Sequence, residues 1–328
     1  MEYKYTRKTM DPTIKLTVPT VYGDTPSFLG VPVARSKEDL KGMDAVFLGG
    51  GGSGFPKDVV NPWRHDIGMR FNPSSWLGVE ADPITSAQRL RFTSLKYGDY
   101  IPEFEIEVFK HVKLVDYGDQ GRDLKKLGEV LDAGCIPIAM RCCRTGELVK
   151  AVADHTKGKV GVIALDSHGD CAMMPPWLGW ADEIANIEKV DMTKFVHIGF
   201  HGPRNFKEQH EWLKDKGAHV FMPWKEIKKN GMEAVAKEAV EIVHDGTDSQ
   251  VLLFNLDVLD MSVAPGLDEF LGISMSDVLT LFHEVGKSGF TAFNVIWAPS
   301  SIMPMYHAIT WSILWLLAGL GIRKSARI

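Results

Sequence analysis

The stretch VGVIALDSHGD, Val160–Asp170, decides the fold class of this chain and points to a candidate site. Its first half is an unbroken apolar run, which is typical of a strand buried on both faces of a parallel sheet. Its second half places Asp166, His168 and Asp170 at alternate positions, so a continuing strand directs all three side chains to one face. Carboxylates with one imidazole suit Mn(II), Ni(II), Fe(II) or Zn(II). The spacing predicts a metal-type site, and the alternative is a capping Asp beside an isolated His.

The rest of the chain alternates between strand-like and helix-like segments. Apolar strands are expected at 45–48, 112–116, 136–140, 160–165, 195–199, 219–221, 251–257 and 291–297. Helices are expected at 84–96, 124–133, 146–155, 206–216, 225–245 and 274–288, with a buried terminal helix at 308–322. This alternation predicts a single three-layer α/β/α domain with a mostly parallel sheet over residues 44–328. A proline-rich arm precedes it at residues 1–43.

A second strand end carries the same polar alternation. Asn255 and Asp257 close the strand expected at 251–257 and share one of its faces. Open parallel sheets bind ligands beyond the carboxyl ends of their strands, so these side chains are expected near Asp166 and His168. Two matched strand ends predict a cradle for a metal ion.

Composition narrows the class of protein. The chain has 328 residues, 45% hydrophobic and 24% charged, with a net charge of −5. These values are ordinary for a soluble globular protein and favour neither nucleic acid nor an anionic membrane as a partner. The four cysteines, at 135, 142, 143 and 171, form no CxxC pair, so we expect a reducing, cytoplasmic setting. The apolar run at 308–322 is shorter than the roughly 20 residues that span a bilayer.

Several motifs resemble those of the ureohydrolases, the family of arginases and agmatinases. Asp166–Asp170 resembles the family's Asp-Ala-His-x-Asp, and Phe254–Gly266 resembles its Ser-Phe-Asp-x-Asp-x-x-Asp-Pro-x-x-Ala-Pro-Gly. Ile198–Gly202 and Gly272–Ser274 resemble two shorter motifs, in the family's order, over about residues 25–322. The resemblance implies an arginase-like fold. It also implies two Mn(II) or Ni(II) ions, held by six ligands, whose bridging hydroxide attacks a guanidinium carbon.

This chain departs from the family at two of the six ligand positions. Four positions match: Asp166, His168, Asp170 and Asp257. The family's Gly-Gly-Asp-His-Ser falls on residues 141–145, so its histidine ligand becomes Arg144, and its bridging aspartate becomes Asn255. Arginine has no lone pair to offer a metal. We therefore expect Arg144 to take the place of one ion and to pair with Asp166, Asp170 or both; the alternative is that it points to solvent.

The pocket implied by the resemblance is altered as well. The glutamate that grips the substrate guanidinium in the family falls near Ile296, and the loop after the first motif has Trp177 and Trp180 but no histidine. Asp166, His168 and Asp257 could still hold a single ion. The four matching ligand positions are therefore expected to be vestigial or to bind one Ni or Mn ion.

These departures predict a catalytically degenerate subunit that assembles with an active paralogue. Family members form trimers and hexamers, so the resemblance implies a hetero-oligomer, with a hexamer expected and two Ni or Mn ions in the partner. The pattern resembles the non-catalytic subunits of two-subunit, nickel-dependent biguanide hydrolases. The alternative is an independent metal-dependent amidinohydrolase that cleaves the C–N bond of a substituted guanidine in a reworked, agmatinase-like site. A sensor that binds a guanidino compound without turnover is a third hypothesis.

Overall fold

The central feature of the fold is an eight-stranded, fully parallel sheet. The computed structural model describes residues 3–5, 18–50, 85–121, 123–172, 179–263, 269–298 and 303–326. The strand order is β10-β9-β8-β11-β12-β7-β3-β6. The strands are β3 (Ala45–Gly49), β6 (Leu114–Asp119), β7 (Ile136–Met140), β8 (Val160–Leu165), β9 (Val190–Ile198), β10 (His219–Phe221), β11 (Ser249–Asn255) and β12 (Ala292–Trp297). All neighbouring pairs are parallel, so their carboxyl ends meet at one edge.

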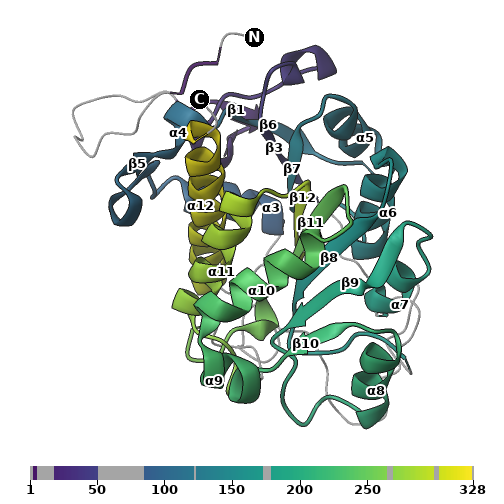
Figure 1. The fold of residues 1–328 in the computed structure, drawn as a ribbon. Helices are drawn as coiled ribbons and strands as arrows, with labels where there is room; N and C mark the ends of the chain where they lie inside the picture. The colour runs from purple at the N-terminus through teal and green to yellow at the C-terminus, as the bar shows by residue number, and fades with distance from the viewer. Residues whose placement is uncertain are drawn as a thin grey trace, which may run out of the picture.

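Helices cover both faces of the sheet. One face carries α3 (Ser86–Ser94), α10 (Met232–His244), α11 (Met275–Ser288) and α12 (Met303–Ser325), and the other carries α5 (Lys125–Asp132), α6 (Thr145–His155) and α7 (Trp180–Ala185), as Figure 1 shows. The other described α-helices are α4 (Val108–His111), α8 (Lys207–Asp215) and α9 (Lys228–Asn230). Two apolar clusters, one on each face, form the core. The predicted three-layer α/β/α class with a parallel sheet is confirmed.

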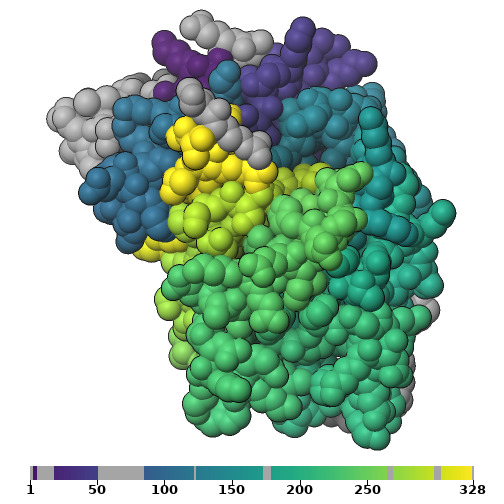
Figure 2. Space-filling view, viewed as in Figure 1, coloured from purple at the N-terminus to yellow at the C-terminus, as the bar shows by residue number. Residues whose placement is uncertain are grey.

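The terminal helix α12 is part of this core. Ile309, Leu316 and Leu317 are completely buried on it, although it is long and apolar enough to cross a membrane. It packs tightly on α11: a Cβ at Gly286 would lie 2.1 Å from the Leu316 carbonyl oxygen. Figure 2 shows α12 in yellow beside the green residues of the carboxyl-terminal half. The predicted buried terminal helix is confirmed, and its apolar length reflects packing on two sides.

One predicted helix is interrupted. The segment expected to be helical over 225–245 consists of a π-helical turn at Pro223–Ile227, then α9, then α10. Gly231 separates α9 from α10 with a φ of +77°, a conformation that glycine adopts without steric cost. The helical spacing of apolar residues over 225–245 continues across Gly231, so this spacing does not predict the break.

The described part of the amino-terminal segment packs against the sheet. A short antiparallel pair, β1 (Thr20–Tyr22) and β2 (Thr25–Pro26), leads to the buried Phe28, whose ring stacks on Phe47 of β3 with centroids 4.5 Å apart. The Phe28 N–H donates to Asp116 at 2.9 Å. Residues near 28 thus contribute to the core, and the domain boundary expected at residue 44 stays a prediction.

Candidate metal centre

Adjacent strands bring three of the predicted ligand residues together. Asp166 follows β8, and Asp257 lies in a 3-10 turn at Leu256–Val258 that follows β11. Because β8 pairs with β11 from Val160–Ser249 to Leu165–Phe254, the two strand ends coincide. One ligand atom from each of Asp166, His168 and Asp257 lies within 4.8 Å of the others. The predicted convergence of two strand ends is therefore present, and it forms a group able to hold a metal ion.

Asp166 lies at the bottom of this group and is engaged through both oxygens. Its Oδ1 accepts a hydrogen bond from the His168 N–H at 2.8 Å, and its Oδ2 accepts one from Asn255 Nδ2 at 2.9 Å. Complete burial, followed by the charge of Asp257, raises the pKa of Asp166 well above its ordinary value. Asn255 thus supplies a hydrogen-bond donor at the position where the family resemblance implies a bridging carboxylate.

His168 provides the positive charge of the cluster. Its Nδ1 lies 3.2 Å from Asp257 Oδ2 and 3.7 Å from Asp166 Oδ1, and its Nε2 lies 2.9 Å from Glu269 Oε1. The last contact is an ion pair whose N–H does not point at the oxygen. Burial by itself would lower the pKa of His168, but Asp257, Glu269 and Asp166 outweigh it and raise the pKa to about 11. At neutral pH His168 is therefore an imidazolium in this arrangement.

Glu269 is a site residue that sequence reasoning missed. Only 2% of it is exposed, and its Oε1 also accepts a hydrogen bond from Arg204 Nη1 at 2.7 Å. Burial raises the pKa of Glu269, but His168 and Arg204 reverse the effect and lower it overall. The one available signal was its position soon after the family-like segment that ends at Gly266. No periodic pattern in the sequence predicts that Glu269 lies against His168.

Asp170 is not in the group formed by Asp166, His168 and Asp257 within the described part of the chain. Its carboxylate accepts a hydrogen bond from the Trp180 indole Nε1 at 2.8 Å. Its backbone has a φ of +42°, so the strand alternation does not continue to this residue. Burial, opposed by the charge of His168, raises the pKa of Asp170 to about 6. β8 ends at Leu165, so the predicted period-two alternation does not extend over Asp166, His168 and Asp170; the bend after β8 brings Asp166 and His168 together.

Arg144 does not pair with Asp166 or Asp170. It stands at the amino-terminal cap of α6, its side chain is 48% exposed, and its guanidinium pairs with Glu183 of α7. The prediction that Arg144 pairs with Asp166 or Asp170 is wrong, and the alternative of an outward-pointing side chain is correct. His168 already supplies the cation that the buried carboxylates need. Glu183 of α7 lies close enough to the start of α6 to pair with Arg144 there.

The described pocket residues predicted from the sequence, Ile296 and Trp180, are not members of the group formed by Asp166, His168 and Asp257. Ile296 is a partly buried residue of β12, whose neighbour Trp297 pairs with Asn255 across the sheet. Trp180 starts α7 and directs its indole N–H to Asp170. Trp177 lies outside the described residues. The guanidinium-binding carboxylate that the family resemblance implies near Ile296 has no counterpart at that position in the sequence.

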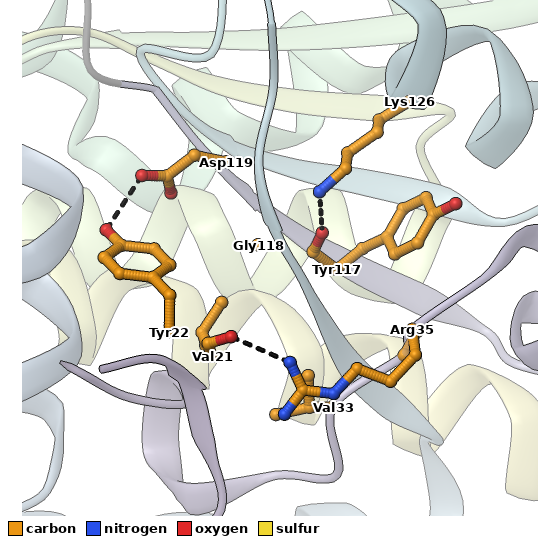
Figure 3. Close-up of a pocket in the computed structure, with 9 residues that line it drawn as sticks. Val21, Tyr22, Val33, Arg35, Tyr117, Gly118, Asp119 and Lys126 are labelled. Carbon is orange, nitrogen blue, oxygen red and sulfur yellow. Dashed lines mark hydrogen bonds between the residues drawn. The ribbon is translucent and has the colours of Figure 1, made fainter. Parts of the chain in front are cut away.

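A cavity of about 270 Å³ elsewhere in the molecule does not belong to this centre. It lies beside β6 at the opposite edge of the sheet from β10 (Figure 3). Its polar side chains have partners: Tyr22 donates to Asp119 at 2.9 Å, Lys126 to the Tyr117 carbonyl at 2.6 Å and Arg35 to the Val21 carbonyl at 2.8 Å. The cavity is therefore part of the packing of the amino-terminal segment.

Asp166, His168 and Asp257 form a donor set that suits a divalent ion. Two carboxylates and an imidazole are a reasonable set for Mn(II) or Ni(II) once His168 has lost its proton. A second ion would need a bridging carboxylate where Asn255 stands and a ligand where Arg144 points away. Asp166, His168 and Asp257 thus form a possible metal-binding triad among the described residues, and two of the six ligand positions implied by the resemblance differ.

Comparisons with known proteins identify the family of this chain. The model of the arginase family matches residues 86–297. An arginase from Brevibacillus brevis is 29% identical over 241 residues, which make up 65% of this chain and 77% of that protein.

Solved structures show the same fold. A hypothetical agmatinase from Burkholderia thailandensis has a TM-score of 0.71 at 17% identity, over 95% of this chain and 98% of that chain. A formiminoglutamase from Trypanosoma cruzi, solved with manganese, has a TM-score of 0.70 at 19% identity, over 92% and 100% of the two chains. The match of the family model to most of the sheet, together with the arginase-like fold, shows that this chain belongs to the arginase family of ureohydrolases.

Proposed function

We propose that this chain is a ureohydrolase-fold subunit whose own two-metal centre has been dismantled, and that it assembles with an active, metal-dependent paralogue. The paralogue would hold two Ni or Mn ions and hydrolyse a guanidino or biguanide substrate such as metformin (dimethylbiguanide). A hetero-oligomer, with a hexamer expected, and a cytoplasmic location belong to the same proposal.

The observation that carries the proposal is the charge balance at Asp166. Its two oxygens accept hydrogen bonds from Asn255 and from the His168 backbone, while the His168 side chain lies among Asp166, Asp257 and Glu269. The protein's own donors and an imidazolium thus satisfy the carboxylates that metal ions would otherwise neutralise. Clustered carboxylates without any cation would repel one another, so this arrangement supports a centre that is stable without metal.

A second candidate function has an observation in its favour. Because Arg144 pairs with Glu183 at the surface, it does not obstruct Asp166, His168 and Asp257. An independent amidinohydrolase with a single ion, acting on a substituted guanidine, would use these three residues as ligands. The ion would polarise bound water, and the imidazolium proton of His168 would have to leave before metal could bind.

Purification of the chain alone, of a paralogue with all six ligands, and of both together tests the assembly. We expect the two chains to co-elute from size-exclusion chromatography, with hydrolysis only where the paralogue is present. Activity of this chain alone contradicts the proposal, and so does failure to associate with the intact paralogue.

Metal analysis separates the two candidates. After loading with Mn or Ni, the degenerate subunit should retain less than about 0.1 equivalent per chain, because its ligand set is incomplete. The double variant Arg144→His with Asn255→Asp restores the two altered positions and should take up metal, whereas Asn255→Asp alone is the matched control. Stoichiometric metal in the unaltered chain favours the single-ion enzyme.

A further inference from the structure

We propose that Arg141 forms a binding site for a small anion, a carboxylate or a phosphate group, at the carboxyl edge of the sheet beside the candidate metal centre. Arg141 directly follows β7, and nothing in the proposed function uses it.

Among the residues that the structure describes, the Arg141 guanidinium has a single hydrogen-bonding partner. It has five N–H donors. Its one hydrogen bond among the described residues is a long one, 3.5 Å from Nη1 to the Ala298 carbonyl oxygen, and no described carboxylate lies within ion-pair distance. The fully buried Arg91 is the internal comparison. It donates to Asp116 at 2.8 Å and to Asp119 at 2.7 Å. Arg91 is thus fully buried and fully paired, whereas the partly buried Arg141 has no carboxylate partner among the described residues.

Arg141 lowers the stability of the ligand-free protein in two ways. Desolvation by burial lowers the pKa of Arg141, because an unpaired charge has lost water without gaining a counter-ion. Its backbone also has a φ of +51°, a left-handed conformation that side chains other than glycine rarely adopt. The resemblance described above places a family glycine at this position. An arginine with a left-handed backbone and no described carboxylate partner is a candidate ligand-binding group.

The surroundings of Arg141 favour a negative charge. The amino-terminal end of α3 lies here, since Ser86 Oγ donates to the same Ala298 oxygen at 3.1 Å, and a helix amino terminus carries partial positive charge. The Tyr306 hydroxyl lies 3.5 Å from that oxygen. Burial raises the pKa of Tyr306, while the side chain of Ser86 and then the charges of Arg141 and Arg89 oppose the rise. An anion here would meet cations, hydroxyl groups and a helix terminus.

The sheet order relates this site to the metal centre. β12 lies between β7 and β11, so Arg141 is two strands away from Asn255. Neighbouring strands lie about 4.8 Å apart, which puts the two positions about 10 Å apart. A ligand with an anionic group at Arg141 could extend its other end toward Asp166. A purely cationic guanidine would be repelled by Arg141. The inference does not rest on the proposed function, because anion binding requires neither metal nor a partner chain.

Calorimetric titration of the full chain with inorganic phosphate, acetate and glutarate, at constant ionic strength in chloride, tests the site. We expect saturable binding of at least one anion, weakened about tenfold or more in Arg141→Gln, because the charged donor is removed. Arg144→Gln is the matched control: the same residue type, three positions along the same loop, but exposed and already paired with Glu183. A preference for phosphate or for carboxylate identifies the ligand group. The inference is overturned if none of the three binds, or if both variants bind as the unaltered chain does.

The variant Arg141→Gly separates binding from a structural role. Glycine relieves both the φ strain and the unpaired charge. We therefore expect a higher thermal unfolding midpoint for the ligand-free variant together with loss of anion binding. A lower midpoint would show that Arg141 stabilises the fold and would overturn the inference.

Discussion

At the scale of single residues, the charge balance of the candidate centre depends on which side chain supplies its positive charge. Arg144 is the residue that sequence comparison puts in the centre, yet it pairs with Glu183 at the surface. His168, which the family resemblance casts as a metal ligand, instead lies among Asp166, Asp257 and Glu269. An imidazolium cannot bind a metal ion, so proton and metal compete for this side chain.

Removal of the His168 charge should destabilise the metal-free chain. We expect His168→Asn to lower the free energy of unfolding by about 3 kcal/mol, because it leaves buried carboxylates without their cation. Urea denaturation in the presence of a chelator measures the change. The control is His155→Asn, whose histidine contacts the exposed Asp132 at the surface. Equal stability of the two variants would show that His168 does not balance the cluster.

At the scale of elements, the helices α11 and α12 pack backbone against backbone. Gly286 on α11 and Gly319 on α12 each face the backbone of the other helix: a Cβ would lie 2.1 Å from the Leu316 oxygen and 2.3 Å from the His283 oxygen, respectively. These glycines let the two helices approach more closely than any side chain would allow.

A pair of glycine substitutions tests this packing. Gly286→Ala should cost about 2 kcal/mol or more, because the obstructing atom is backbone and cannot rotate away. Gly128→Ala on α5 meets nothing within 4 Å and should stabilise by up to about 1 kcal/mol through helix propensity. Chemical denaturation of both variants checks the opposite signs. Similar effects would indicate that α12 moves aside easily.

The contact between α11 and the turn at Pro102–Phe104 should make stability depend on pH. His283 stacks on Phe104 with ring centroids 3.9 Å apart, and burial, followed by the charge of Lys287, lowers the pKa of His283 despite the nearby Glu284. A histidine with a lowered native pKa binds its proton more readily when unfolded, so its contribution is complete above pH about 6.5 and is lost as pH falls.

The expected result is a flatter dependence of unfolding free energy on pH, below about pH 7, in His283→Gln than in the unaltered chain. Substitution of the exposed His219 by Gln serves as the control. If both variants keep the original slope, His283 does not titrate with unfolding.

At the scale of the whole molecule, Arg91 links segments that are far apart in the chain. It extends from α3 to Asp116 and Asp119 of β6, and Asp116 in turn accepts the Phe28 N–H of the amino-terminal segment. A substitution here should therefore loosen the amino-terminal segment as well as the edge of the sheet.

We expect Arg91→Met to destabilise the chain by about 3 to 5 kcal/mol, since it leaves the carboxylate of Asp116 buried and unpaired. Limited proteolysis should then cut the amino-terminal segment first. The matched comparison is Arg91→Met with Asp116→Asn, which removes the unpaired charge and should recover part of the loss. No recovery would mean that the packing of Arg91, rather than its charge, is what stabilises this region.

Sequence by itself determined the strands, the parallel sheet and the two strand ends of the candidate centre, because these depend on local apolar runs and on period-two alternation. Asp166, His168 and Asp257 were located from that pattern alone. Only the tertiary structure decided the direction of Arg144, the turn of Asp170 toward Trp180, and the place of Glu269 against His168. Each of these depends on competition between charges brought together from distant segments, and no local spacing encodes which cation pairs with which carboxylate.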